Sequence, residues 1–392
     1  MDPSESGLAR ADEVYLMDRR MLLSCLAAAS VAPAACLRRA DGNGDRLSIL
    51  MLGGTNFVGP HLVQAALERG HTVTLFNRGH TNPDLFPRVE RLKGDRYPDR
   101  NHGLSALETT RTWDAVIDTW QAEPGCVDLT ARLLAHRTER YVYVSSIATY
   151  RSFRGIGITE TGPMIDAKEH IASFDGSLDY RVRKRAAEQA VERSFGGAAT
   201  LLRCTSIVGF HRGGAASEQV AGYWVPRFLA REPLLAPDDP TAVIQLIDVR
   251  DMAEFAIRAI EQDFGGAYNM VGPEKPLPLR DYLLALNQAT GHRSQIVWVA
   301  PAFLLERGVR PFDDVPNWIP ADDPEPGFYR ISNSKSLAHG LRYWPLLKSI
   351  SDAIGAELLQ VPVDGIASEP EGPGLRRARE RELIEEWVAH QG

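Results

Sequence analysis

Short apolar runs alternate with longer amphipathic stretches along most of this chain. Residues 48–52 (SILML) are apolar and end at a glycine-rich turn, which is typical of a strand buried on both faces of a parallel sheet. Residues 58–69 place apolar side chains on one helical face, and Gly70 stands where a helix C-cap is expected. Residues 72–76 (TVTLF) form a second apolar run, so this order predicts one compact βαβ unit.

The same alternation of strand and helix patterns continues beyond this first unit. Further strands are expected at residues 90–92, 114–118, 140–146 and 200–203, and further helices at residues 127–135 and 180–194. Repeated strand-then-helix order predicts an α/β protein with a Rossmann-type doubly wound parallel sheet.

The length of 392 residues allows a second, smaller lobe beside this sheet. We expect the domain of this sheet at residues 48–208 with a return at 243–266, and a smaller C-terminal lobe at residues 209–242 and 267–350. Residues 363–392 are expected to form a linker and a charged helix that docks through Leu383, Ile384 and Trp387. Four aromatic residues of the lobe could line the substrate site or belong to its core: Trp224, Trp298, Trp318 and Phe328.

Residues 1–47 differ from the rest of the chain. The pair Arg19-Arg20 precedes an Ala-rich apolar run at residues 21–37, which is shorter than the roughly 20 residues of a membrane span. Small residues near position 32 resemble a signal cleavage site. The arginine pair together with the apolar run resembles a twin-arginine export signal. We therefore expect an exported, periplasmic protein without an integral membrane span after signal removal. The alternative is an uncleaved extension of a cytoplasmic protein.

The turn GGTNFVG at residues 53–59 has the chemistry of a dinucleotide site. Gly53 permits a tight turn, and Gly59 permits close packing of the helix on the strand. Backbone N–H groups at the helix N-terminus can receive a pyrophosphate, whereas a βαβ turn without a ligand is the alternative. The expected cofactor contacts in this turn are Gly53, Thr55, Asn56, Phe57, Val58 and Gly59.

The residues after the second strand bear on the choice between NAD and NADP. An acidic side chain there would bind the adenine ribose hydroxyls of NAD, but this chain has Asn77 followed by Arg78. Arg78 could meet the 2′-phosphate of NADP, stack on adenine or lie solvated in a loop. We expect NAD or NADP as the cofactor, with a slight preference for NADP.

Two further patterns supply candidate catalytic groups. Residues 145–150 (SSIATY) end the fifth strand, at the sheet edge where ligands of such folds bind. In residues 180–184 (YRVRK), helical spacing places Tyr180 and Lys184 on one face. An ammonium and a positive nicotinamide ring would lower the pKa of Tyr180 from about 10, so that it exchanges protons near neutral pH. A core tyrosine beside a surface lysine is the alternative.

These motifs together resemble the extended short-chain dehydrogenase/reductase family, in its NAD-dependent epimerase/dehydratase branch. The resemblance covers about residues 48–350, and Asn56 departs from it at the middle glycine position of G-x-x-G-x-x-G. Asparagine tolerates left-handed backbone angles, so the turn can survive this change. The resemblance implies that Ser146, with Ser145 as the fallback, orients the reacting oxygen beside Tyr180, and that Asp95 contacts adenine.

The resemblance also implies an activity. It indicates an NAD(P)-dependent oxidoreductase or epimerase that acts on a hydroxylated, sugar-like small molecule, and it makes a homodimer plausible. Ile147 follows Ser146 where a dehydratase needs an acid, which disfavours that specialised reaction.

Charge and cysteine content bear on two other functions, nucleic-acid binding and metal binding. A net charge of -7 disfavours nucleic-acid binding, and the four cysteines form no C-x-x-C pair, so no metal site is expected. Two other hypotheses stay open: a non-catalytic NAD(P)-binding module, and an RNA-binding protein. The second rests on a resemblance of the GGTNFVG…FNRG pattern to the branch that includes chloroplast stem-loop-binding proteins.

Overall fold

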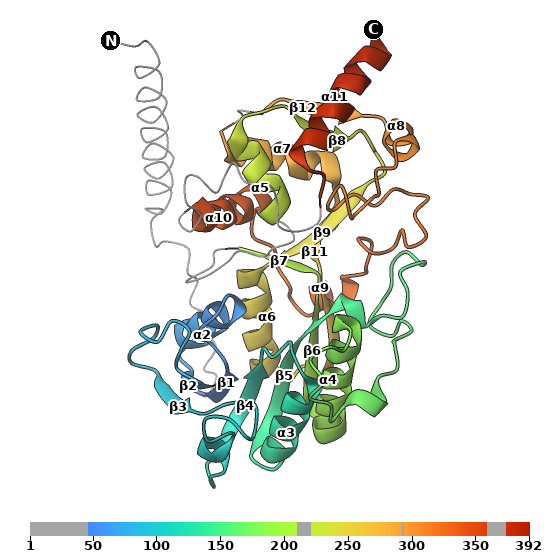
Figure 1. Cartoon of the computed structure of the whole chain (residues 1–392). Coiled ribbons are helices and arrows are strands. Elements are labelled where there is room, and N and C mark those ends of the chain that lie inside the picture. The colour runs from blue at the N-terminus through green and yellow to red at the C-terminus, as the bar shows by residue number, and fades with distance from the viewer. Residues whose placement is uncertain (1–45, 210–220, 292–293, 359–373) are drawn as a thin grey trace, which may run out of the picture. The chain divides into compact units, whose positions relative to one another are not determined.

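The computed structural model describes residues 46–209, 221–291, 294–358 and 374–392 (Figure 1). The expected export signal, up to residue 45, lies outside the described residues, as do residues 210–220 of the expected lobe and most of the expected linker. Within the described ranges, no helix has both the length and the apolar character needed to cross a membrane.

Seven parallel strands form the main sheet, in the order β10-β6-β5-β4-β1-β2-β3. The strand order reverses between β1 and β4, so a crevice is expected at the carboxyl ends of these two strands. The strands are β1 (Ser48–Leu52), β2 (Thr72–Asn77), β3 (Glu90–Lys93), β4 (Trp113–Asp118), β5 (Thr138–Ser146), β6 (Ala199–Cys204) and β10 (Gly266–Met270).

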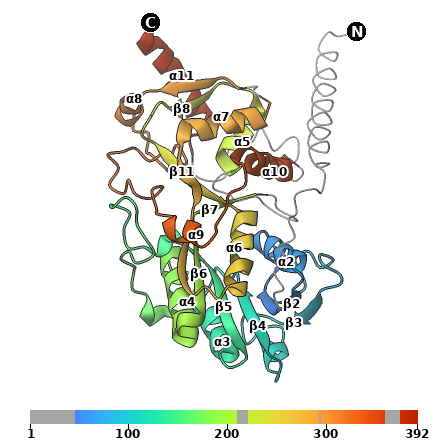
Figure 2. The same cartoon turned by 180° about the vertical axis from the view of Figure 1, so that it is seen from behind.

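Helices cover both faces of this sheet, as the continuous apolar strand patterns predict. Helices α2 (Val58–Glu68) and α6 (Val249–Glu261) pack side by side on one face (Figure 2), and α3 (Pro124–Leu134) and α4 (Tyr180–Phe195) on the other (Figure 1). Successive residues of β1 alternate between the two cores. Ile49 and Met51 join the α2/α6 core, and Leu50 and Leu52 join the α3/α4 core.

The C-terminal lobe has a core of its own around a small strand pair, and further strands and helices complete it. Its strands are β8 (Leu234–Pro237) with β12 (Ile296–Val299), and β7 (Ser206–Val208) with β9 (Val243–Asp248) and β11 (Gly272–Pro278). Its helices are α5 (Ala221–Ala230), α7 (Leu279–Ala289), α8 (Pro301–Glu306), α10 (Leu346–Leu358) and α11 (Arg377–Gln391), whereas α9 (Ser334–Ala338) packs on edge strand β10 of the main sheet.

Two segments pair differently from the expected division. Residues 267–350 belong to the expected lobe, but Gly266–Met270 forms edge strand β10 of the main sheet, parallel to β6. Residues 243–266 belong to the expected first domain, and α6 packs on the main sheet, yet strand β9 pairs with β7 and β11 in a separate three-stranded sheet. An apolar run indicates burial but does not identify the neighbouring strand.

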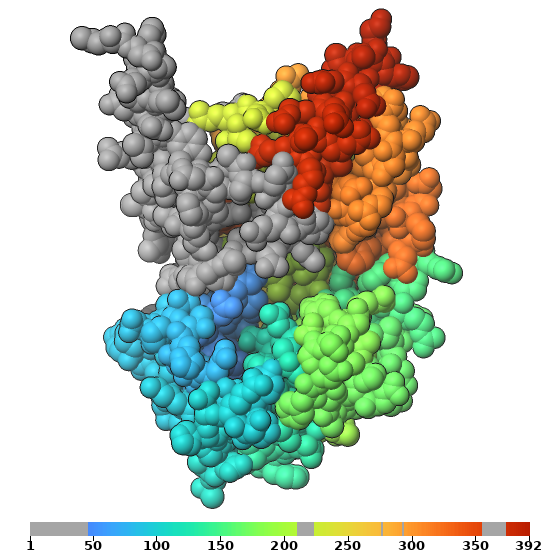
Figure 3. All heavy atoms as spheres, viewed as in Figure 1, coloured from blue at the N-terminus to red at the C-terminus, as the bar shows by residue number. Residues whose placement is uncertain are grey.

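The C-terminal helix α11 docks through the predicted apolar residues. Leu383 is fully buried in the lobe core, and Ile384 and Trp387 pack against it. The helix lies along the lobe surface (Figure 3), where the Trp387 and Phe303 ring centroids are 4.9 Å apart. Of the aromatic residues proposed as alternative substrate contacts, Trp224 and Trp318 are fully buried core residues, whereas Trp298 and Phe328 are partly buried.

Candidate active site

The glycine turn between β1 and α2 requires its glycines. Gly53 and Gly54 have φ values of 108° and 90°, which only glycine adopts without strain. A Cβ atom on Gly59 would lie 2.6 Å from the Cα of Gly54, so helix α2 can approach the turn only without a side chain there. The close packing at Gly59 is therefore against the turn itself, at Gly54, rather than against the strand as expected.

The departure at Asn56 is accommodated differently from our expectation. Phe57, rather than Asn56, has a positive φ, of 29°, and caps α2. The carbonyl of Asn56 accepts a hydrogen bond from the Gly59 N–H at 2.9 Å. The bend therefore lies one residue later, at the helix N-cap, and the position of Asn56 needs no left-handed residue.

Asparagine side chains brace this turn from outside. The Nδ2 of Asn77 donates to the carbonyl of Gly53, and the Nδ2 of Asn82 donates to the carbonyl of Thr55, both at 2.8 Å. The Oδ1 of Asn77 accepts from the Gly79 N–H at 3.0 Å. Asn77 therefore holds the turn in shape, a role that the sequence pattern did not indicate.

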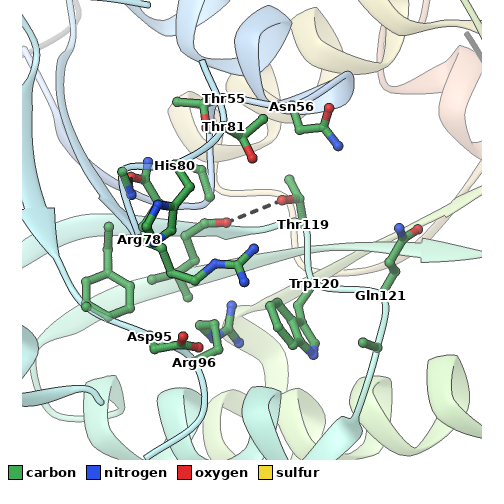
Figure 4. Close-up of a pocket in the computed structure, with 18 residues that line it drawn as sticks. Thr55, Asn56, Arg78, His80, Thr81, Asp95, Arg96, Thr119, Trp120 and Gln121 are labelled. Atoms are coloured by element: carbon green, nitrogen blue, oxygen red, sulfur yellow. Dashed lines mark hydrogen bonds between the residues drawn. The ribbon is translucent and has the colours of Figure 1, made fainter. Parts of the chain in front are cut away.

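A cavity of about 330 Å³ opens above this turn (Figure 4). It lies at the carboxyl ends of β1, β2 and β4, where the N–H groups of the glycine turn and of the start of α2 can receive a pyrophosphate. The predicted residues that line it are Gly53, Thr55, Asn56, Asn77, Arg78 and Asp95. The residues that sequence reasoning missed include Gly54, His80, Thr81, Arg96, Thr119, Trp120 and Gln121.

Charged side chains stand at two sides of this cavity. Arg78 is exposed, and its guanidinium points across the cavity toward Trp120 (Figure 4). Asp95 is buried and accepts hydrogen bonds from the Tyr97 N–H at 3.1 Å and from Asn101 at 3.2 Å, which fixes its carboxylate in the cavity wall. Predicted contacts Phe57, Val58 and Gly59 are not among the described residues of the lining, and they form the start of α2 behind it.

Arg96, which lines the cavity, forms a buried ion pair with Asp118. The two terminal nitrogens of Arg96 each donate to one carboxylate oxygen of Asp118 at 2.8 Å. Burial alone would raise the pKa of Asp118, but Arg96 and the Tyr141 hydroxyl more than offset this effect and hold the pKa below its usual value. Asp118 also accepts from the Trp120 N–H at 2.9 Å, so the pair fixes the backbone that follows β4.

Ser146 and Tyr180 are brought together at the end of β5. Tyr180 begins helix α4 and is 41% exposed. Partial burial raises the pKa of Tyr180, while a hydrogen bond from Ser146 and the charge of Arg183 lower it less strongly. In the protein alone, the pKa of Tyr180 therefore lies above its usual value, whereas the lowering expected from the sequence includes the charge of a bound nicotinamide ring. The fallback Ser145 is buried and donates to Glu188 at 2.7 Å.

Lys184 is held by the framework of the sheet. Its ammonium donates to the carbonyls of Val144 and Trp120, at 2.8 and 3.1 Å, and to the Tyr143 hydroxyl at 3.2 Å. These acceptors match the three N–H bonds of an ammonium group. Burial lowers the pKa of Lys184 to about 8. Because Trp120 also lines the cavity, Lys184 connects the Tyr180 helix to the nucleotide cavity.

The other nearby nucleophile is inert. Cys204 is buried at the end of β6, and burial raises the pKa of its thiol to about 12. A thiol with this pKa carries almost no thiolate at neutral pH, so Cys204 is a core residue, as expected.

Known proteins resemble this chain in sequence and in fold. The chain is 26% identical over 273 residues to 2'-dehydrokanamycin reductase of Streptomyces kanamyceticus, covering 67% of this chain and 72% of the relative. It is 24% identical to UDP-glucose 4-epimerase of Corynebacterium glutamicum, covering 63% of this chain and 81% of the relative. The structure of UDP-glucuronic acid 4-epimerase from Bacillus cereus, in complex with NAD, has the same fold, with a TM-score of 0.55 and 15% identity. This match covers 80% of our chain and 99% of that one.

A family model supplies the assignment. The model of the NAD dependent epimerase/dehydratase family matches residues 49–271, which is more than half of the 392 residues. Those residues include the glycine turn, the end of β5 and the Tyr180 helix. The chain therefore belongs to the NAD dependent epimerase/dehydratase family and is an enzyme of that family.

Proposed function

We propose that the protein is an NAD(P)-dependent oxidoreductase or epimerase that acts on a hydroxyl-bearing, sugar-like small molecule through Ser146, Tyr180 and Lys184. The observation that carries this proposal is the approach of the Ser146 side chain to that of Tyr180 at the end of β5, where Tyr180 is 41% exposed. Lys184 ties the same helix to Trp120, which lines the nucleotide cavity. We therefore place the reacting group of the substrate against Ser146 and Tyr180, open to solvent and on the helix that Lys184 connects to the nucleotide cavity.

Each side chain has a separate task in this proposal. Tyr180 accepts the proton of a substrate hydroxyl, or returns it to a carbonyl oxygen, and Ser146 orients that same oxygen. When bound, the nicotinamide supplies hydride chemistry at the substrate carbon. Since the pKa of Tyr180 lies above 10 in the protein alone, proton removal depends on positive charge nearby. Arg183 and the ammonium of Lys184, one helical turn away, supply part of that charge.

The test is a Tyr180→Phe variant in a screen of polyols and sugars, with the absorbance of reduced nicotinamide as the signal. Loss of a general acid–base group is expected to lower turnover by about 10²- to 10⁴-fold, with cofactor binding retained. The matched control is Tyr268→Phe, because Tyr268 is a buried tyrosine of β10 outside the cavity lining. Turnover by Tyr180→Phe at the wild-type rate would overturn the assignment.

We infer a preference for NADP from the residues after β2. No carboxylate follows this strand, the amide of Asn77 is engaged with Gly53 and Gly79, and Arg78 is exposed at the cavity. A charge-assisted contact between Arg78 and a 2′-phosphate would contribute about 1.5–3 kcal/mol, or roughly ten- to hundredfold in affinity. Arg78→Ala should weaken NADPH binding by that factor and leave NADH binding almost unchanged. Arg88→Ala, at an exposed arginine outside this cavity, is the control. Equal affinity of the wild type for both nucleotides would contradict the inference.

Export by a twin-arginine route also remains part of the proposal, and it rests on Arg19-Arg20 and the apolar run at residues 21–37. Cell fractionation of the full chain and of an Arg19→Lys/Arg20→Lys variant tests it. The wild type is expected outside the cytoplasm and the variant inside. Identical distribution of the two proteins would remove the twin-arginine signal from the proposal.

A further inference from the structure

The segment that follows Ser146 is clamped by the neighbour of Tyr180. The Nε of Arg181 donates to the carbonyl of Ala148 at 3.0 Å. Its Nη2 donates to the carbonyls of Tyr150 and Arg151, at 2.6 and 3.1 Å. One guanidinium at the start of α4 therefore holds three carbonyls just beyond Ser146. A guanidinium suits this task, because its donors form a rigid planar fork.

The residue that precedes Ser146 is held by the same helix, two turns further along. Glu188 has no exposed surface, and it accepts a hydrogen bond from the Ser145 hydroxyl at 2.7 Å. Arg203 of β6 donates to both carboxylate oxygens of Glu188, at 2.9 and 3.1 Å, and Arg185 donates at 2.8 Å. Glu188 therefore fixes the position of α4 relative to β5 and β6.

Stability alone does not explain these buried charges. Removing two charges from water costs several kcal/mol per ion, and apolar residues of similar volume often serve a core equally well. Glu188 is nevertheless fully buried, and its carboxylate accepts four hydrogen bonds. What this arrangement provides is a fixed geometry, because a bidentate carboxylate–guanidinium pair tolerates little displacement.

We propose that Arg181 and Glu188 are positioning residues that set the distance between the Ser146 hydroxyl and the Tyr180 hydroxyl. This inference rests on the proposed function, in which those two hydroxyls hold the reacting oxygen. Ser146 lies between Ser145 and Ala148, and each of these neighbours is bound by a side chain of the helix that carries Tyr180. A displacement of about 1 Å between reacting groups can lower the rate about a hundredfold. Holding the backbone on both sides of Ser146 is therefore expected to maintain the reaction rate.

The experiment reads the Tyr180 hydroxyl directly and needs no substrate. Protein labelled with ¹³C at tyrosine Cζ gives one resonance that Tyr180→Phe removes, and its chemical shift reports hydrogen bonding of the phenol at neutral pH. Ser146→Ala is expected to shift this resonance, and Arg181→Met should shift it in the same direction. In the double variant, Arg181→Met should add nothing to Ser146→Ala, because it acts only through that hydroxyl. NADPH affinity and the melting temperature should stay close to those of the wild type.

Two further variants keep the result interpretable. Glu188→Gln tests the second fixed point. It should produce the same shift, at a lower melting temperature because the buried Arg203 guanidinium loses its carboxylate. Arg193→Met, on the same helix but paired with Asp128 of α3, is the control and should leave the resonance unchanged. With a substrate from the Tyr180 screen, Arg181→Met and Glu188→Gln should lower kcat about ten- to hundredfold at constant KM.

An unshifted resonance in Arg181→Met and Glu188→Gln, or shifts that add to that of Ser146→Ala, would overturn the positioning role. Full turnover by Tyr180→Phe would instead overturn the proposed function, so the two failures are distinguishable.

Discussion

Substitution of Gly59 by alanine tests the nucleotide site most directly. The added Cβ would lie 2.6, 2.7 and 2.9 Å from the Cα, C and N atoms of Gly54. These are backbone atoms of a residue with a φ of 90°, and side chains of Met51 and Leu75 surround Gly54 closely. The Gly54 backbone cannot move away from the added Cβ atom without strain, so helix α2 must shift away from the turn.

The expected cost follows from this overlap. Overpacking of a tight contact costs about 1–3 kcal/mol, which lowers the melting temperature by a few degrees. A shifted helix also turns its N–H groups away from the pyrophosphate, and a loss of similar size weakens cofactor binding by roughly ten- to hundredfold.

The assay is a titration with NADPH and NADH, with energy transfer from tryptophan to the reduced nicotinamide as the signal. Trp120 lines the cavity and is the expected donor. Gly197→Ala is the matched control, because a Cβ atom at Gly197 would have no heavy atom within 4 Å and its φ is not positive. If Gly59→Ala binds both nucleotides as tightly as the control and melts at the same temperature, the reasoning about the glycine turn is refuted.

Three other predictions concern buried groups. Burial lowers the pKa of Lys184 from 10.5 to about 8, so between these values the unfolded chain binds a proton that the folded chain does not. The stability of the wild type relative to Lys184→Met should therefore rise with pH across that window, by about 3 kcal/mol in total, and urea midpoints that keep a constant difference would contradict this. Asp118→Asn should leave the Arg96 guanidinium buried without its carboxylate and lower the free energy of unfolding by about 3–5 kcal/mol, whereas a urea midpoint within error of the wild type would show that the pair is dispensable. Leu383→Ala should cost about 2–5 kcal/mol because this side chain is fully buried in the lobe core, and thermal unfolding that changes by less than one degree would show that α11 is not part of that core.

The local elements around the site could be predicted from the sequence alone. The run at residues 48–52 coincides with β1, and the expected helix at residues 180–194 coincides with α4 to within one residue. Strand and helix patterns, glycine positions and the i, i+4 spacing of Tyr180 and Lys184 are properties of short segments, so they can be recognised without knowledge of the partners.

The contacts between distant segments became known only from the three-dimensional structure. Apolar patterns did not show that β10 joins the main sheet while β9 leaves it. They also did not show that the Lys184 ammonium would be bound by Trp120 and Val144, or that Arg181 would hold the segment after Ser146. Hydrophobic burial is nondirectional and fixes which residues lie inside, whereas strand pairing and hydrogen bonding depend on neighbours distant in the chain.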